Sequence, residues 1–159
     1  MDKIRLHYLV GDVHMGGHDV HRVAVNNKIL LDATNAFDVT MVCDDKRIGN
    51  VDFDTWFAEE MVKNCDVIVF NCGNYRFNVR EEQRVLEQAV AGGVGFVFLH
   101  GDHPCYWVEA GMQPWPEVEK MAMFMWREKT SHGDFGNHHV TIQDHEHPIT
   151  VGLPDYDTR

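Results

Sequence analysis

Short apolar runs alternate with longer amphipathic segments along most of this chain. The apolar runs are rich in β-branched and aromatic residues, and they predict strands at residues 4–10, 37–43, 66–71 and 95–100. The amphipathic segments between them predict helices. Because strand and helix alternate three times over with short connections, the pattern favours a parallel sheet with helices on both faces, joined by right-handed crossovers.

Residues at the helix ends support this pattern. Asp19 is suited to cap the first helix. Its buried face is expected to consist of residues at roughly helical spacing, namely Val20, Val23, Ala24, Leu30, Leu31 and Thr34. A shorter helix is expected within residues 53–62.

The later elements are less regular. Asn78 and Glu81 form a capping box for the next helix, and Gly92-Gly93 is suited to a left-handed cap at its end. A further helix is expected from Trp115 to about residue 125, and a last strand at residues 138–144. The methionines near residue 123 are interpreted as packing residues, because methionine commonly fills irregular apolar space.

Composition narrows the class of protein. The chain has 159 residues, 44% of them hydrophobic, which fits one domain spanning residues 1–159 with a real core. Its net charge of −11 and the lack of any Lys/Arg cluster argue against nucleic acid. No apolar run is long enough to cross a bilayer and no signal peptide is recognisable, so we expect no membrane partner and a cytoplasmic location. The four cysteines contain no C-x-x-C pair and are expected to be reduced.

Candidate chemistry gathers after three of the predicted strands. In an open parallel sheet, ligands bind beyond the carboxyl ends of the strands. The loops at those ends contain His14, His18, Asn71, His100, Asp102 and His103. Any one of these histidines alone is more simply a solvated loop residue, but their convergence at one edge favours a functional site.

Histidine chemistry at this edge suggests a metal or a proton shuttle. His100-x-x-His103 provides two imidazoles, and a third ligand from His14, His18 or His132 would complete a site for a divalent metal such as zinc. Two alternatives are weaker. Cys72 and Cys105 lie in candidate loops, but neither occupies a nucleophile elbow. Gly92 and Gly93 precede a strand and not a helix, so a phosphate-binding loop is not supported there and no nucleotide cofactor is expected.

Several motifs resemble those of the trehalose-utilisation (ThuA-like) family. They are G-G-V-G-F-V-F-L-H-G from Gly92, W-P-E-V, W-R-E-K-T-S-H-G-D-F, and V-T-I-Q-D-H-E-H-P-I-T-V-G-L-P-D, together with the helices H-D-V-H-R-V-A and R-E-E-Q-R-V-L-E-Q-A-V. The resemblance covers nearly the whole chain. It implies the flavodoxin-like fold of class I glutamine amidotransferases, an α/β three-layer sandwich with a mainly parallel sheet. In that superfamily the elbow holds a catalytic cysteine, whereas here His100 stands in its place, so no functional glutamine amidotransferase is expected.

The resemblance also implies a role in carbohydrate metabolism, and it carries over His14 or His18, His100 and His132 as site residues. The remaining site residues are expected from their chemistry and their place in the sequence. We expect His100, His132 and Asp102 to be catalytic, and His100, His103 and His14 to bind a metal. The residues expected to bind substrate are His14, His18, Asn71 and Trp107. His147 is equally consistent with a structural role in its proline-flanked turn.

Family members usually continue beyond the G-L-P-D segment, whereas this chain stops at Arg159. The sequence leaves open a C-terminally truncated piece and a short member of the family. An exposed sheet edge left by the missing segment would favour a homodimer.

Two functional hypotheses follow. In the first, the protein processes trehalose, a related glycoside or a keto-sugar, using histidines that bind a metal or shuttle protons, in an isomerase-, hydrolase- or lyase-type reaction. In the second, it is a non-catalytic ligand-binding or interaction module that has lost the amidotransferase nucleophile. Metal content discriminates between them.

His100→Ala tests the histidine site directly. Loss of one ligand from a three-residue set should sharply weaken metal binding, while a side chain at a strand end contributes little to the core. We expect tag-free wild-type protein to contain metal by elemental analysis, and the variant to lose it with an unchanged circular dichroism spectrum. A variant that retains its metal would contradict the assignment.

Overall fold

The computed structural model of the 159-residue chain describes residues 2–11, 19–72, 79–99, 115–122, 133–134 and 136–158. The chain divides into two compact units, residues 1–127 and 128–159. The first contains the parallel sheet and its helices, and the second a small antiparallel pair. Each unit is described by itself below.

The first unit is built on a four-stranded parallel sheet with the order β2-β1-β3-β4. The strands are β1 (Ile4–Val10), β2 (Phe37–Val42), β3 (Val67–Asn71) and β4 (Gly95–Phe98). The prediction of four neighbouring parallel strands is therefore confirmed, and the α/β architecture is consistent with a flavodoxin-like sandwich.

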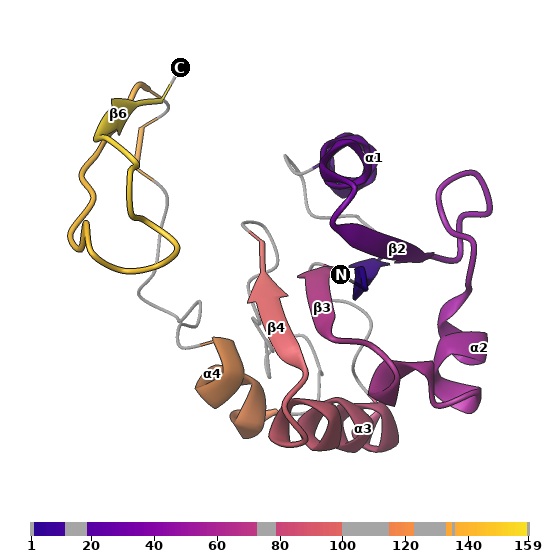
Figure 1. The fold of residues 1–159 in the computed structure, drawn as a ribbon. Helices are drawn as coiled ribbons and strands as arrows, with labels where there is room; N and C mark the ends of the chain where they lie inside the picture. Colours follow the sequence, from indigo (N-terminus) through magenta and orange to yellow (C-terminus); the bar gives the residue numbers. More distant parts are fainter. Residues whose placement is uncertain are drawn as a thin grey trace. The chain divides into compact units, whose positions relative to one another are not determined.

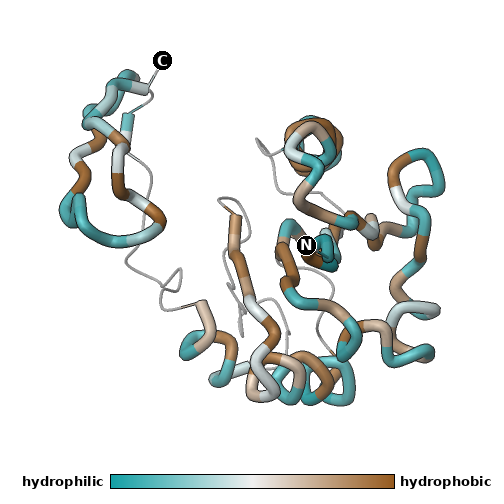
Figure 2. Tube along the Cα trace, viewed as in Figure 1, coloured by the Kyte–Doolittle hydropathy of each residue, from teal (hydrophilic) through white to brown (hydrophobic). Residues whose placement is uncertain are grey.

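Strand β4 is shorter than predicted. It ends at Phe98, although the backbone N–H of Leu99 still donates to the Phe70 carbonyl at 3.2 Å. Its sequence is hydrophobic along its length (Figure 2). Phe96 and Phe98 pack against Phe70 on one face, with ring centroids 5.7 and 5.2 Å from it. Aromatic packing between neighbouring strands therefore fixes this end of the sheet.

Helix α1 (Val20–Thr34) covers one face of the sheet (Figure 1). As predicted, Asp19 caps it, with its carboxylate accepting the Arg22 N–H at 3.0 Å. The predicted buried face is wrong in part, because Val23 and Leu30 are 41% and 66% exposed and Thr34 is exposed as well. Val20, Ala24 and Leu31 do face the sheet, and Asn27 joins them. This stripe includes a polar residue because the Asn27 side chain donates to the buried Tyr8 hydroxyl.

The opposite face is covered by α2 (Phe53–Ala58), the 3₁₀ turn η1 (Met61–Lys63), α3 (Arg80–Ala91) and α4 (Pro116–Ala122) (Figure 1). They bury a cluster of apolar side chains against the sheet. It includes Trp56 of α2, Leu86 of α3, and Trp115 and Val118 at α4, which pack with Phe70 and Ile68 of β3. The prediction of helices on both faces is confirmed.

The ends of these helices differ slightly from the sequence prediction. Helix α3 begins one residue late, with Val79 as its N-cap and no side-chain capping bond; Asn78 lies outside the described residues. The glycine pair ends it as expected, with Gly93 at φ +102°. Met121 packs against the core, whereas the rest of the methionine cluster lies outside the described residues.

The second unit contains the antiparallel pair β5 (His139–Val140) and β6 (Tyr156–Asp157). The strand predicted at residues 138–144 is reduced to two residues, because a turn follows it. In this turn His147 accepts the Ile149 N–H on its Nδ1 at 3.2 Å, and its carbonyl accepts the N–H of Thr150. The side chain of His147 therefore has a structural function within its own turn.

No helix within the described part of the chain has both the length and the apolar character that a membrane span requires.

A buried hydrogen bond joins the centre of the sheet to α2. The Trp56 indole Nε1–H donates to His7 Nδ1 at 2.9 Å, and both side chains are buried. This bond requires a neutral His7 imidazole, since a protonated Nδ1 has no lone pair to accept it. Burial lowers the pKa of His7, and Arg5 adds to this effect, while Asp38 and Asp66 oppose it.

Stability should therefore fall as the solution is acidified. An unfolded histidine has a pKa near ~6.5, so below that pH the unfolded chain binds a proton that folded His7 resists. We expect this group to lower the free energy of unfolding by up to about 1.4 kcal/mol per pH unit below ~6.5. Urea denaturation between pH 7.5 and 5 measures the slope. Asp66 does not contribute between pH 7.5 and 5, because hydrogen bonding by Arg5 lowers the pKa of its carboxyl to about 2.

His7→Asn is the control for this slope. Its amide oxygen stands near the position of Nδ1 and still accepts from Trp56, but it does not titrate. The variant should have a flatter pH profile than the wild type, and an identical profile would show that other histidines determine the slope.

The carboxyl ends of β1 and β3 approach each other closely at Gly11. Its N–H donates to the Asn71 carbonyl at 3.2 Å, and a Cβ at this position would stand 2.3 Å from the Cys72 carbonyl oxygen. Because the obstacle is backbone, no rotamer change relieves it. In contrast, a Cβ at Gly95 would meet its nearest neighbour, the Val67 side chain, at 3.4 Å.

Gly11→Ala should separate the two strand ends and lower the free energy of unfolding by about 1–3 kcal/mol. Gly95→Ala, the matched control, should leave it unchanged or raise it by up to about 1 kcal/mol. Chemical denaturation of both variants gives the comparison. Equal stabilities would show that the strand ends accommodate a side chain.

Candidate functional site

A hollow of about 320 Å³ lies where β1 and β2 end. Parallel pairing brings these carboxyl ends to one edge of the sheet, which is the usual place for a ligand in such folds. Among the described residues, its lining consists of Val10, Gly11, His21, Cys43, Asp44, Asp45 and Phe53. Four elements thus contribute: the end of β1, the loop after β2, and the starts of α1 and α2.

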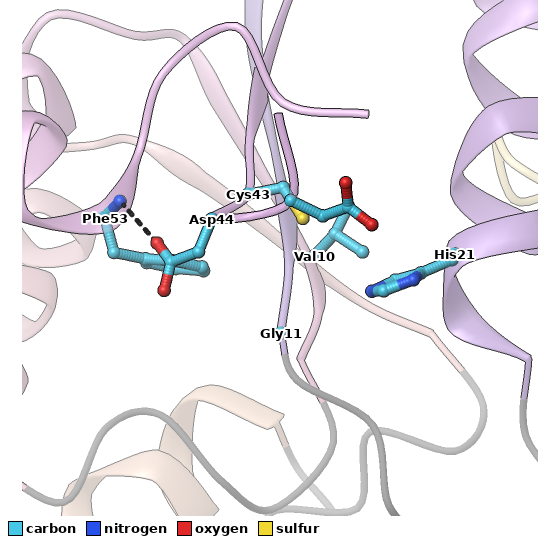
Figure 3. A pocket seen from close by; sticks show the side chains of 7 residues that line it. Val10, Gly11, His21, Cys43, Asp44 and Phe53 are labelled. Carbon is cyan, nitrogen blue, oxygen red and sulfur yellow. Dashed lines mark hydrogen bonds between the residues drawn. The ribbon is translucent and has the colours of Figure 1, made fainter. Parts of the chain in front are cut away.

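His21 enters the hollow from the first turn of α1. In Figure 3 its imidazole points from the helix toward Val10, while Asp44 lies on the other side beside Phe53. The Asp19 cap fixes where this turn begins, so it also fixes the position from which the His21 side chain projects. The imidazole and the Asp44 carboxylate therefore come from opposite walls of the hollow.

Asp44 is held at the start of α2. Its carboxylate accepts the backbone N–H of Phe53 at 3.3 Å, and the neighbouring cap Asp52 accepts the Thr55 N–H at 2.7 Å. Hydrogen bonding by Thr55 lowers the pKa of Asp52. These bonds satisfy N–H groups that a helix start leaves without partners. Asp44 remains exposed, so it can also meet a ligand.

Asp45 forms a compact ion pair with Arg47. One carboxylate oxygen accepts the backbone N–H and Nε–H of Arg47 at 3.0 and 2.9 Å, and the other accepts from its terminal nitrogen at 2.6 Å. Hydrogen bonding by Arg47 holds the pKa of Asp45 well below its usual range, with a small contribution from nearby His21. Asp45 is therefore a permanent carboxylate beside the hollow.

The loop after β2 is closed by its own hydrogen bonds. The Asp45 carbonyl accepts the N–H groups of Ile48 and Gly49, both at 2.9 Å. The side-chain oxygen of Asn50 accepts the Met41 N–H at 2.8 Å, and the Met41 carbonyl accepts the Asn50 N–H at 3.0 Å. This wall of the hollow is thus anchored to β2 at both of its ends.

The cysteines that the structure describes are poorly suited to nucleophilic chemistry. Cys43, Cys65 and Cys72 are buried and form no disulfide. A reactive thiol needs a lowered pKa and some exposure, and burial instead raises the pKa of Cys65 to about 11. Cys72 has no exposed surface, which argues against it as a nucleophile; Cys105 lies outside the described residues.

One of the site residues expected from the sequence can be located. Asn71 is the last residue of β3 and is 1% exposed. Its side-chain N–H groups donate to the Val20 carbonyl at 3.1 Å and the Tyr8 hydroxyl at 3.3 Å. It is not among the residues that line the hollow. A role for Asn71 in contacting substrate stays a prediction.

The other predicted site residues fall outside the described part of the chain. They are His14, His18, His100, Asp102, His103, Trp107 and His132. Their predicted roles, and the metal site they were expected to form, stay predictions. Within the described ranges, no group of three His, Cys, Asp or Glu side chains is placed to hold a metal ion.

Sequence reasoning missed His21, Asp44 and Asp45. The rule that ligands bind at the carboxyl ends of strands was applied to the loops after the first, third and fourth strands, and the loop after the second was left out. The signal was present, because Asp44 and Asp45 follow that strand directly. His21 follows the predicted cap Asp19 by two residues and therefore belongs to the same edge.

Comparison with known families agrees with this architecture. The family model for ThuA, described as trehalose utilisation, matches residues 9–159. No curated protein and no solved structure gives a significant match. The match begins near the end of β1 and includes β2, β3 and β4, the residues that line the hollow, and the antiparallel unit. The chain therefore belongs to the ThuA family, whose description indicates a role in trehalose utilisation.

Proposed function

We propose that the protein binds and processes a small sugar, either trehalose, a related glycoside or a keto-sugar, in the hollow at the carboxyl edge of β1 and β2. The observation that supports this most directly is the joint presence of His21, Asp44 and Asp45 around one cavity in a member of a trehalose-utilisation family. The family supplies the class of ligand, and the cavity supplies a place with suitable chemistry.

The lining combines polar groups that can bind sugar hydroxyls with apolar side chains that can pack against a sugar ring. Carboxylates accept hydrogen bonds from hydroxyl groups, and imidazole both donates and accepts them. Val10 and Phe53 are buried apolar residues that would face the C–H groups of a sugar ring. A volume of about 320 Å³ is at the lower end of the ~300–1,000 Å³ typical of small-molecule sites. The hollow therefore suits one sugar ring better than an extended oligosaccharide.

Proton transfer is the chemistry that these residues offer. Imidazole exchanges a proton near neutral pH more readily than any other side chain. His21 would then move a proton to or from a sugar hydroxyl or carbonyl, while Asp44, on the opposite wall, would orient the ring. We also propose three further acid–base groups from the sequence alone, namely His100, His132 and Asp102.

A metal-dependent form of the reaction is proposed from the same sequence argument. His14, His100 and His103 would provide neutral imidazole ligands for a divalent ion such as zinc. Such an ion would polarise a sugar hydroxyl or carbonyl.

Substitutions at the hollow test the proposed function. His21→Gln keeps a polar side chain but removes proton transfer, and Asp44→Asn removes the charge while its amide oxygen can still accept the Phe53 N–H. Loss of a hydrogen bond to a charged group costs about 1.5–3 kcal/mol, so Asp44→Asn should weaken sugar binding about 10- to 100-fold. Saturation-transfer NMR and calorimetric titration with trehalose, glucose and fructose measure the effect, and product formation is followed in parallel.

His145→Gln and Asp54→Asn are matched controls, since both residues are exposed and neither lines the hollow. They should bind sugar as the wild type does. Sugar bound without turnover would favour the alternative of a ligand-binding module. Binding unchanged in both hollow variants would show that the sugar site lies elsewhere.

A further inference from the structure

A buried amide links the end of β3 to the first turn of α1. The Asn71 side-chain nitrogen donates one hydrogen to the Val20 carbonyl at 3.1 Å and the other to the Tyr8 hydroxyl at 3.3 Å. Asn71 is 1% exposed and Tyr8 is also 1% exposed. Both donors of this amide are thus satisfied within the protein, and three elements meet at one side chain.

Position 71 would suit an apolar residue if its only role were to pack in the core. Asn71 follows Val69 on the face of β3 that α1 covers, and Val69 packs in that core. Burying an amide costs free energy unless its hydrogen bonds are made. Here they are made to groups of fixed position, so the amide adds a directional restraint that a leucine or valine would lack.

The restraint acts directly beside His21. Val20 is the first residue of α1, and its carbonyl has a second lone pair besides the one used within the helix. The first turn of a helix frays easily because its N–H groups lack helical partners. Asp19 holds this turn through the Arg22 N–H, and Asn71 holds it through the Val20 carbonyl. His21 lies in the turn that these two bonds fix.

We propose that Asn71 is a positioning residue that sets the direction in which His21 projects into the hollow. This inference rests on the proposed function in assigning His21 to the sugar site. In this proposal Asn71 acts on His21 through the backbone of α1 and does not contact the sugar itself. The supporting geometry is the series of hydrogen bonds that joins Tyr8 to Asn71 and Asn71 to Val20. Val20 is the residue directly before His21.

Asn27 offers a matched control within the same network. Its side-chain nitrogen donates to the Tyr8 hydroxyl at 2.9 Å, but from a position two turns along α1. Asn27→Leu therefore removes a partly buried hydrogen bond between α1 and β1 and leaves the Asn71–Val20 bond intact. If α1 were merely loosened as a whole by either substitution, both variants would disturb His21 equally.

The experiment compares Asn71→Leu and Asn71→Ser with Asn27→Leu by NMR of the histidine ring protons and carbons. The His21 signal is assigned from its absence in His21→Gln, and no ligand is needed. We expect the His21 signal to shift and broaden in both Asn71 variants and to stay unchanged in Asn27→Leu, although all three lower the melting temperature. Sugar affinity should fall about threefold to tenfold in the Asn71 variants.

The two Asn71 variants guard against failure to fold, because serine is small and polar whereas leucine keeps the branched shape of asparagine without its hydrogen bonds. An unchanged His21 signal in either folded variant overturns the proposal, and so does an equal disturbance in Asn27→Leu. If the wild type binds none of the sugars, the proposed function fails while the His21 signal still decides the role of Asn71. The two failures are therefore distinguishable.

Discussion

Parallel hydrogen bonding of β1 with a strand on each side determines where everything else in the first unit is placed. Because β2 and β3 run in the same direction as β1, the three strands end at one edge. Every connection must then return along a face of the sheet, so helices cover both faces. The residues that follow the strand ends are gathered at that edge without any need for contacts among themselves, and the hollow lies there.

Adjacent residues of β1 place one polar group on each face of this sheet. His7 faces α2 and accepts from Trp56, whereas Tyr8 faces α1 and accepts from Asn27 and Asn71. Buried polar groups add little net stability, but they are costly when mispaired and therefore favour one arrangement over others. Helices α1 and α2 are thus each held in register with the central strand by a hydrogen bond as well as by apolar packing.

The sequence predicted the sheet well because its signals are local. Apolar runs identified the strands, Asp19 identified the start of α1, and Gly93 identified the end of α3. The buried face of α1 was predicted less well, since periodicity alone does not reveal that Asn27 faces the sheet to meet Tyr8. The polar lining of the hollow was missed because Asp44 and Asp45 look like an ordinary polar loop, and their place at the hollow depends on which strand end they follow. The histidine-rich loops are recognisable in the sequence, and the residues that were expected to form the site there lie outside the described part of the chain.

The loop after β2 has a consequence for binding energetics. Its conformation is determined by the Asp45–Arg47 pair, by the Asp45 carbonyl and by Asn50, none of which requires a ligand. A loop that becomes ordered only on binding loses conformational entropy at that moment, which weakens the observed affinity. Here that loss accompanies folding, so this side of the hollow is preorganised. Contacts that a ligand makes with this side of the hollow therefore cost the protein little conformational entropy.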